Sequence, residues 1–582
     1  MVELTFERSL TDLYSSAALG YQTELARKFW GEIPQTLGQI PSLVMKKRKQ
    51  WIYNDIEESF ELLRELLVAT YQKFGILTIP MKETINNLSD QSGIIEVSHQ
   101  TLFMGGQPFL FNKVSFTDYF SRYSEKDNHI FPLFYIADYD VVQNELTLGR
   151  IPNANSYQGT VLKILLKGFT SGISQVSGLK PPTDKWFVLA RKQILKAYRS
   201  LFRLTDLSLE QRQLFEERLE ASIDIIEDAA LHQNNFADWV GEIWGRVFNI
   251  RNKLKIPLFL ASDQRFRSIM LPGYEKLLSN RLEFIGVLNE IRSELEELGY
   301  KPRIPYRTDD YVPFFYECPQ CKLTRPRIKL ICEERNSDII LSGGCPICRE
   351  EFEFSFSKTN PDLSDIGAYL SPRVDTRASA IATSLPIAVH VGGPGENEYY
   401  AQVVPAMKKI DLIPPIFVKY TRIMYNTPWN EALANQLQKE GHSVIQTSLL
   451  FNHIAEFAKT RENEAILSHL IWMKDHLKQV FEDLINKERE ISEKYAIKSN
   501  RTPQLRNAMN NLRYYLSHAY GRISRDKSIQ ENAFLWFDLA LLTGIKDFSG
   551  LFCRQFREQM PPGSVWYVSS QNFEQMKLKE KE

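Results

Sequence analysis

A strand that runs into a glycine-rich turn and then a helix is the feature that most constrains the fold of this chain. Residues 385–403 read LPIAVHVGGPGENEYYAQV, an apolar run followed by glycines and a proline. We expect a buried strand at 387–391 and a helix that begins near Glu396. Glycine allows the positive φ and the close backbone approach that a tight turn needs. The glycines of the turn are Gly392, Gly393 and Gly395.

A helix that follows such a turn can bind an anion. Its first N–H groups have no partner inside the helix, and the peptide dipoles leave a partial positive charge there. A phosphate or a carboxylate fits these donors. A plain strand-to-helix connection explains the turn equally well, because it has neither the lysine of a P-loop nor the full dinucleotide-binding glycine pattern. We interpret His390, inside the expected strand, as a hydrogen-bonded core residue.

Short apolar runs and amphipathic stretches alternate along most of the chain, as in a parallel α/β fold. Runs at 93–98, 131–137 and 256–261 predict further buried strands. Residues 1–90 are mostly helical in pattern, and residues 274–298 predict one helix that ends at a glycine. A capping box, Ser-Leu-Glu-Gln at 208–211, predicts another helix start.

Polar side chains follow two of these predicted strands. Asp138 and Asp140 come directly after the run at 131–137, and His99 and Gln100 follow the run at 93–98. Because α/β proteins bind ligands at the carboxyl ends of parallel strands, these four residues are the candidate catalytic residues. The acids could bind a metal–phosphate, a ribose hydroxyl or a substrate amine. A solvated loop for the acids and a structural role for the histidine are the alternatives.

Four cysteines have the spacing of a zinc ribbon. Cys318 and Cys321 form one Cys-x-x-Cys pair, Cys345 and Cys348 form another, and the segment between the pairs is rich in strand-forming residues. Four thiolates close a tetrahedral zinc site, so this ion would support folding and not catalysis. A redox pair or a knuckle without metal would have the same spacing.

The C-terminal part has a different pattern. No glycine lies between Gly441 and Gly521, and apolar residues repeat at spacings of three and four from Leu470 to Leu484. This pattern predicts a long amphipathic helix that pairs with another helix. A hairpin within one chain and a homodimer explain it equally well.

Composition narrows the classes of function. The chain has 71 basic and 71 acidic residues, so its charge gives no reason to expect nucleic acid or an anionic membrane as a partner. The first residues lack the apolar core of a signal peptide, and no run approaches the roughly 18 apolar residues of a membrane span. We therefore expect a cytoplasmic, soluble protein.

At 582 residues the chain is too long for one core, and we expect several folding units. The expected units are N-terminal helices with the first half of an α/β core at 1–159, a helical insertion at 160–230, a continuation of the core at 231–310, a zinc ribbon at 311–360, the second half of the core at 361–450, and a helical, coiled-coil region at 451–582.

Several segments match the motifs of one known family in order. They are the Leu-Pro…Val-Gly-Gly-Pro-Gly-Glu…Tyr-x-Ala-Gln pattern at 385–403, Ser-Pro-Arg-Val at 371–374 with Arg377, IEVSHQ at 95–100, GGQP at 105–108, and FYIA with two acids at 134–140. Together they resemble the bacillithiol biosynthesis cysteine-adding enzyme family, BshC, over roughly residues 80 to 420.

The resemblance implies a Rossmann-like core related to nucleotidyltransferases and class I aminoacyl-tRNA synthetases, with a C-terminal coiled coil for dimerisation. It also implies a ligase that joins L-cysteine to the amino group of glucosaminyl-malate, with ATP or ADP as a nucleotide partner. An acid such as Asp138 or Asp140 would orient the amine and accept its proton. The residues expected to bind substrate or nucleotide are Gly392, Gly393, Gly395, Glu396, Arg377 and Tyr399.

The chain departs from the family pattern in three places. Residues 98–101 read SHQT, so one glutamine of the family's pair is lost, and Tyr139 separates the two acids without the family's histidine. The zinc ribbon is a third departure. We therefore keep two alternatives, a ligase of a different amine or acid and a non-catalytic zinc-ribbon protein. The second would bind nucleic acid or a partner through a basic cluster of Lys322, Arg325, Arg327 and Lys329.

Overall fold

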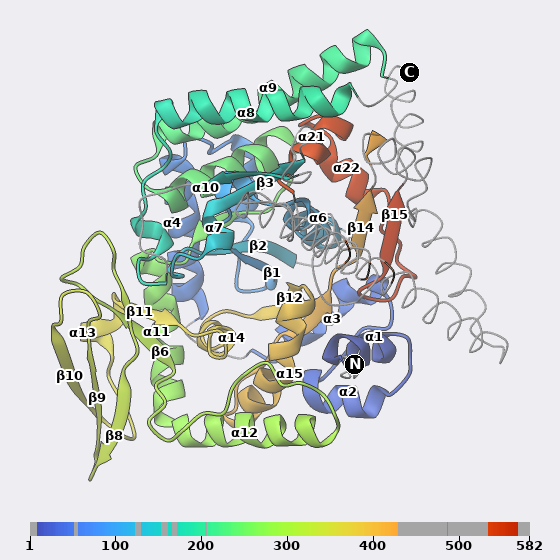
Figure 1. Ribbon diagram of the computed structural model, residues 1–582. Helices are drawn as coiled ribbons and strands as arrows, with labels where there is room; N and C mark the ends of the chain where they lie inside the picture. The colour runs from blue at the N-terminus through green and yellow to red at the C-terminus, as the bar shows by residue number, and fades with distance from the viewer. Residues whose placement is uncertain are drawn as a thin grey trace.

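The structure is a computed structural model that describes most of the chain up to residue 428 and a shorter C-terminal part (Figure 1). The described residues are 9–51, 56–122, 130–152, 161–165, 172–203, 207–425, 427–428, 483, 486, 490 and 534–568. The apolar positions of the predicted coiled coil, from Leu470 to Leu484, lie outside them.

A five-stranded parallel sheet forms the centre of the molecule and confirms the α/β prediction. In sheet order its strands are β13 (Ile416–Lys419), β12 (Ile387–Gly392), β1 (Gly93–Gln100), β2 (Ile130–Ala137) and β5 (Leu258–Leu260). The chain runs from β1 to β2 and β5 on one side and later returns to β12 and β13 on the other. The order in which the strands are added to the sheet therefore reverses between β1 and β12. Ligands bind beyond the carboxyl ends of the strands at such a point.

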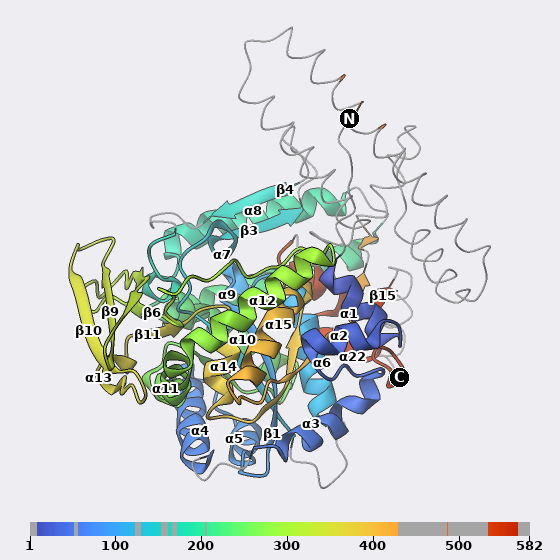
Figure 2. The same ribbon diagram turned by 90° about the horizontal axis from the view of Figure 1, so that it is seen from below.

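Helices cover both faces of the sheet because each crossover between parallel strands carries one. Helix α6 (Pro108–Arg122) joins β1 to β2, and α15 (Pro394–Lys409) joins β12 to β13. Helix α12 (Arg281–Glu297) packs along α15 (Figure 2). The other helices against the sheet are α3 (Ile40–Arg48), α4 (Ile56–Lys73) and α10 (Phe236–Trp244).

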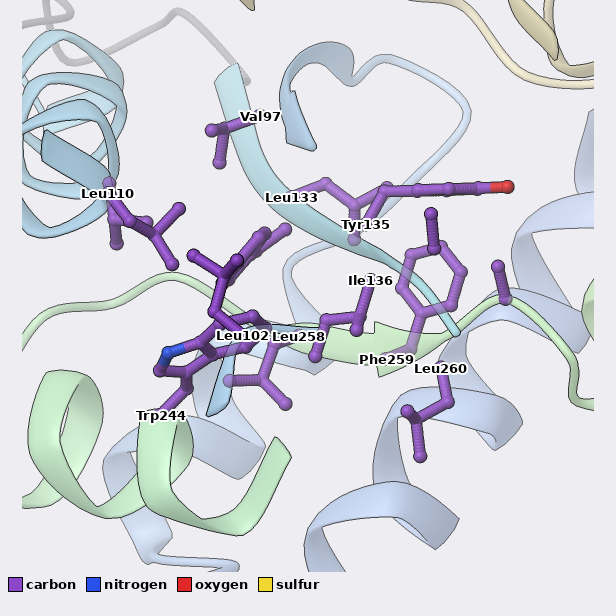
Figure 3. Close-up of a cluster of buried hydrophobic side chains, with 14 of the residues drawn as sticks. Val97, Leu102, Leu110, Leu133, Tyr135, Ile136, Trp244, Leu258, Phe259 and Leu260 are labelled. Carbon is purple, nitrogen blue, oxygen red and sulfur yellow. The ribbon is translucent and has the colours of Figure 1, made fainter. Parts of the chain in front are cut away.

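The strands are mostly apolar because helices bury both faces, and the polar exceptions include Glu96 and His390. Figure 3 shows Ile136 of β2 and Leu258 of β5 on the side of Trp244 of α10, whereas Phe259 of β5 lies away from Trp244. All four side chains are fully buried, and each burial stabilises the fold by about 1.5–3 kcal/mol. The core therefore holds the strand ends at fixed positions.

Outer helices and a small hairpin surround this centre. Helices α8 and α9 lie along one side of the molecule (Figure 1), and the capping box at Ser208 starts α9 as predicted. Strands β3 and β4 pair antiparallel, so the predicted helical insertion at 160–230 begins with a strand. The bounds are α1 (Leu10–Ala18), α2 (Thr23–Trp30), α5 (Ile79–Asn86), α7 (Asn144–Thr147), β3 (Leu148–Pro152), β4 (Val161–Leu165), α8 (Asp184–Phe202), α9 (Leu209–His232), α11 (Gln264–Ser279), α13 (Ser364–Gly367) and α14 (Arg377–Ala382).

The helical pattern predicted at 274–298, with its end at Gly299, is confirmed except for a break at Asn280. The structure has two helices, α11 and α12, which meet at Asn280. The Asn280 side chain donates a hydrogen bond of 2.8 Å to the Lys276 carbonyl and so competes with the backbone for that acceptor. An asparagine inside an apolar pattern thus ends one helix and begins the next.

The cysteine segment forms two small antiparallel sheets. Strands β8 (Ile331–Arg335), β9 (Asp338–Gly344) and β10 (Glu351–Ser357) form a ribbon that projects from one side of the molecule (Figure 2). In the second sheet, β6 (Phe314–Glu317) lies between β7 (Arg327–Ile328) and β11 (Leu370–Pro372) and pairs with both. This second sheet connects the ribbon to the main body.

Residues 534–568 belong to the core, which corrects the prediction of a helical, coiled-coil region at 451–582 for this part alone. They contain two short helices, and their strand β15 (Val565–Val568) pairs with β14 (Arg422–Tyr425). Trp536 is fully buried and donates a hydrogen bond of 2.9 Å to the Met104 carbonyl. The helices are α21 (Phe537–Thr543) and α22 (Phe548–Cys553). No described helix is both long and apolar enough to cross a membrane.

Candidate functional site

A cavity of about 860 Å³ lies at the point where the strand order reverses. The ends of β1 and β2, the loop after β12 and the first turn of α15 form one wall, and the cysteine segment and the 372–377 loop form another. The cavity brings together most of the predicted site residues, namely His99, Gln100, Asp140, Arg377, Gly393, Gly395, Glu396 and Tyr399. Asp138 and Gly392 are not among its lining residues.

Asp138 holds the core together instead of lining the cavity. Its Oδ1 accepts a hydrogen bond of 2.8 Å from the Ser262 backbone N–H, and its Oδ2 accepts one from the Ser262 hydroxyl. Burial raises the pKa of Asp138 to about 6, although the hydrogen bonds from Ser262 oppose this rise. Asp138 therefore ties the end of β2 to the loop after β5, and Asp140 is the acid that faces the cavity.

The glycine turn is built differently from its prediction. None of the three glycines has a positive φ, and the helix begins at Pro394, two residues before Glu396. Close packing explains why residue 392 is a glycine, because a Cβ there would lie 2.4 Å from the Phe417 ring. The N–H of Gly393 donates a hydrogen bond of 2.7 Å to the Glu396 carboxylate. The chain's own carboxylate therefore occupies the donor that an external anion was expected to use.

A chain of buried charged groups lies behind this turn. The Glu396 carboxylate also accepts a hydrogen bond of 2.6 Å from Lys113 Nζ. His390 Nε2 lies 3.3 Å from Glu396 Oε1, and its Nδ1 lies 3.0 Å from Glu96 Oε2. Glu96 Oε1 in turn accepts a hydrogen bond of 2.6 Å from Arg377. His390 is fully buried, as predicted, but it bridges two carboxylates beside the cavity.

These contacts keep both acids ionised. Burial alone would raise the pKa of Glu396, but Lys113 and His390 outweigh burial and hold that pKa well below its usual range. Burial would likewise raise the pKa of Glu96, and Arg377 and His390 lower it to about 2. Charge pairing therefore compensates the cost of burying these groups.

His99 is a neutral group at the cavity. Burial and the neighbouring Lys113 lower the pKa of His99 to about 4. Its Nδ1 lies 2.9 Å from the Gln100 carbonyl, which can only accept, so Nδ1 carries the hydrogen. Within the described residues its Nε2 has no hydrogen-bond partner. Nε2 is therefore an acceptor in a cavity-lining side chain.

Asp140 is held from two sides. Its Oδ1 accepts a hydrogen bond of 2.9 Å from Arg327 of β7, and its Oδ2 accepts one from the Gln100 side chain. Arg327 also donates a hydrogen bond of 2.5 Å to the Pro372 carbonyl, and its guanidinium lies 4.0 Å from the centre of the Phe315 ring. The Asp140 carboxylate thus has a defined orientation.

The cavity is strongly basic although the whole chain has no net charge. The Arg373 guanidinium lies 4.6 Å from the centre of the Phe315 ring and 4.7 Å from that of Tyr311. It donates a hydrogen bond of 2.7 Å to the Val312 carbonyl. No carboxylate lies within ion-pair distance of Arg373 in the described part of the chain. A stacked, uncompensated guanidinium is suited to a carboxylate or a phosphate. The lining arginines are Arg303, Arg307, Arg327, Arg373, Arg377 and Arg422.

The four predicted metal cysteines are brought together, with all Sγ atoms within 4.8 Å of one another. Two Sγ–Sγ distances are 3.6 Å, between Cys318 and Cys348, and 3.8 Å, between Cys321 and Cys345. A tetrahedral zinc ion with Zn–S bonds of 2.3 Å needs sulfur atoms about 3.8 Å apart. The thiol positions therefore fit zinc, and the four of them leave no open coordination position.

The basic cluster considered for nucleic-acid binding does not form one exposed patch. Arg327 lines the cavity, and Arg325 pairs at 2.8 Å with the buried Glu317. Lys322 and Lys329 are the members of the cluster that are exposed. The structure therefore removes the observation on which the non-catalytic alternative was based.

Sequence reasoning did not place Glu96, Lys113 or any cavity arginine other than Arg377 in the site. Glu96 and Lys113 each carry a charge inside a run of apolar residues, at 93–98 and 108–116. A buried charge is costly unless it is paired, so each of them predicts a partner from elsewhere in the chain. This signal could have identified the network, although not which residues pair.

Comparison with known proteins agrees with this geometry. The model of a family described as "Bacillithiol biosynthesis BshC, N-terminal Rossmann-like domain" matches residues 38–420. Three relatives share the name "Putative cysteine ligase BshC". The match in Lysinibacillus sphaericus is 25% identical and covers 38% of each chain. Those in Staphylococcus saprophyticus and Staphylococcus haemolyticus are 21% and 20% identical, over 66% and 82% of this chain.

The first two of these alignments span less than two thirds of the relatives, 38% and 65% of their lengths, and the third spans 81%. The family match itself covers more than half of this chain and includes the whole parallel sheet and every residue that lines the cavity except Arg422. The chain therefore belongs to the bacillithiol biosynthesis BshC family.

Proposed function

We propose that this protein is a ligase that forms an amide between L-cysteine and the amino group of glucosaminyl-malate or a closely related amine. The observation that carries the proposal is the cavity at the strand ends. It combines arginines suited to anionic groups with an oriented acid, Asp140, and a neutral base, His99. The shared name of the relatives supports the same class of reaction.

The chemistry requires an activated carboxylate, and we propose ATP as the activating substrate. The cysteine carboxylate attacks the α-phosphorus of ATP, and pyrophosphate leaves. The neutral amine then attacks the carbonyl carbon of the mixed anhydride, loses a proton and releases AMP. Holding the reacting groups together and stabilising the developing negative charge would supply most of the acceleration.

The cavity offers groups for each part of this reaction. Arg373 and the N–H of Gly395, in the first turn of α15, would bind a phosphate or the malate carboxylates. Asp140 would bind the ammonium group and orient it. His99 Nε2 would accept a proton from the attacking nitrogen. The ion-paired Glu396 would hold the first turn of α15 in place rather than contact the nucleotide.

A product assay tests the proposal. The purified protein is incubated with L-cysteine, glucosaminyl-malate and ATP, and the mixture is analysed by mass spectrometry. We expect the amide product together with equal amounts of AMP and pyrophosphate. The same product formed without nucleotide would contradict the role of ATP, and the absence of any amide would contradict the ligase.

A ligase of a different amine is the second candidate, because the surroundings of Asp140 depart from the family pattern. Tyr139 replaces the family's histidine, and Arg327 reaches Asp140 from the additional cysteine segment. Metabolite analysis of a strain that lacks the gene separates the two candidates. Loss of bacillithiol would contradict the second candidate, and accumulation of another amine would support it.

A homodimer through the region 451–582 stays a prediction. Its support is the apolar repeat in the sequence, from Leu470 to Leu484. Sedimentation of the full chain over a range of concentrations would test it. We expect a species with twice the chain mass, and a monomer at all concentrations would contradict the prediction.

A further inference from the structure

The loop that carries the first pair of metal cysteines is closed by its own backbone. The Cys318 N–H donates a hydrogen bond of 3.1 Å to the Pro326 carbonyl, and the Arg325 N–H donates one of 2.7 Å to the Cys321 carbonyl. Arg327 is therefore the first residue after a closed turn that begins at a metal cysteine. Its position depends on the shape of that turn.

The same turn contacts the backbone that carries Asp140. The Gln175 N–H donates a hydrogen bond of 2.9 Å to the Thr324 carbonyl, and the Val176 N–H donates one of 2.9 Å to the Asp140 carbonyl. The packing at this contact is close, because a Cβ on Gly178 would lie 1.8 Å from the Leu323 carbonyl oxygen. The turn at 318–326 is thus linked to Asp140 by two routes, one through residues 175–178 and one through the Arg327 side chain.

We propose that the metal-closed turn is a positioning element of the cavity, and that Arg327 and residues 175–178 transmit its order to Asp140. Without a metal, the thiols of the turn at 318–326 lose the common ligand that would bind them to the second pair of cysteines. Each backbone residue that becomes free gains roughly 1–2 kcal/mol of conformational entropy, so the turn loses its defined shape. Arg327 and the 175–178 segment then lose the contacts that orient Asp140.

This arrangement gives the metal a function in the site although it has no open coordination position. Arg327 acts through Asp140 and is a positioning residue. That Asp140 binds the substrate amine rests on the proposed function, whereas the order of Asp140 and of residues 175–178 does not. The two can therefore be tested separately.

Hydrogen–deuterium exchange tests the positioning role without any substrate. Peptides that cover 138–142 and 173–178 are followed in the zinc-loaded protein, in the chelated protein and in Arg327→Ala. We expect exchange in both peptides to become about tenfold faster on chelation. In Arg327→Ala, exchange at 138–142 should rise while the zinc content and the cobalt–thiolate absorption spectrum stay unchanged. The matched control is Arg335→Ala, an exposed arginine on the ribbon, which should change neither peptide.

Unchanged exchange in both peptides after complete zinc removal would overturn the proposal. Arg327→Ala keeps all four thiolates, so it remains informative if the chelated protein unfolds. In the ligation assay, Arg327→Ala should raise the KM for the amine about tenfold or more with a smaller change in kcat. An Arg327→Ala enzyme with an unchanged KM would also count against the positioning role, even if ligation itself is confirmed.

Discussion

At the scale of single residues, the site depends on charges that are buried and paired. Lys113 has 1% of its side chain exposed and Glu96 has 4%, and each lies within ion-pair distance of a group of opposite charge. Glu396 joins the two through His390. Such a network adds little net stability compared with apolar residues, but it makes removal of any one partner costly. It therefore favours one arrangement of the first turn of α15.

Removal of Lys113 should destabilise the protein strongly. Lys113→Ala leaves the Glu396 carboxylate without its cation, and we expect a loss of about 3 kcal/mol in the free energy of unfolding. Urea denaturation measures this loss. The control is Lys46→Ala, which breaks the exposed pair with Glu32 and should cost less than about 1 kcal/mol. Equal losses in both variants would contradict the structural role of the network.

The pKa of His99 predicts how stability depends on pH. The folded protein keeps His99 neutral down to about pH 4, whereas the ordinary pKa is 6.5. The unfolded chain therefore takes up a proton first as the pH falls, and folding loses up to about 1.4 kcal/mol per pH unit between these values. His99→Gln should remove this part of the slope in urea denaturation.

The control for that measurement is His232→Gln, an exposed histidine of α9. Both variants lose one histidine, so only a change specific to His99→Gln counts as support. A slope that is the same in His99→Gln and in the unchanged protein would contradict the neutral state of His99. In the ligation assay, the same neutral state predicts that activity falls near pH 4 and not near pH 6.5.

At the scale of elements, the turn between β12 and α15 is shaped by packing. Gly392 lies against Phe417 of β13, whereas a Cβ on Gly395 would meet no atom within 4 Å. Neither glycine has a positive φ. Because the backbone conformation restricts neither position, substitutions at the two glycines test only the space available for a side chain.

Alanine at these two glycines should have opposite effects. Gly392→Ala places a methyl group in the Phe417 ring, and we expect a loss of about 1–3 kcal/mol in the free energy of unfolding. Gly395→Ala adds a methyl group to the first turn of a helix in open space and should be neutral or stabilise by up to about 1 kcal/mol. Thermal unfolding of both variants checks this order, and the reverse order would show that the turn is built differently.

The sequence predicted elements well where the signal is local. Short, mostly apolar runs predicted β1, β2, β5 and β12, because a strand buried on both faces is rich in apolar residues. The break at Asn280 was missed because it depends on one side-chain hydrogen bond. Strand β15 was missed because its partner, β14, lies more than a hundred residues earlier in the chain.

At the scale of the whole molecule, the cavity joins segments that are distant in the sequence. Arg327 and Asp140 are 187 residues apart, and Lys113 and Glu396 are 283 apart. The motifs could therefore suggest His99, Gln100, Asp140 and Arg377 as site residues, but not which of them meet. The same limit explains why Asp138 was placed in the site, since only the packed structure shows that it binds Ser262.

Zinc removal should act on the whole molecule through the cysteine segment. We expect one zinc ion per chain, and chelation should lower the midpoint of thermal unfolding because the four thiols then lose their common ligand. Metal analysis with scanning calorimetry measures both. Cys348→Ser should reproduce the lower midpoint, and Cys332→Ser, which lies outside the cluster, should keep the zinc. A zinc-free protein with an unchanged midpoint would contradict this role.

The central claim is that the arginine-lined cavity at the strand ends is the site of amide ligation. The most direct test compares the ATP-dependent rate of product formation in the unchanged protein, in Arg373→Ala and in the exposed control Arg335→Ala. We predict that Arg373→Ala loses about tenfold or more in kcat/KM while Arg335→Ala retains full activity. A full ligation rate in Arg373→Ala would contradict the claim.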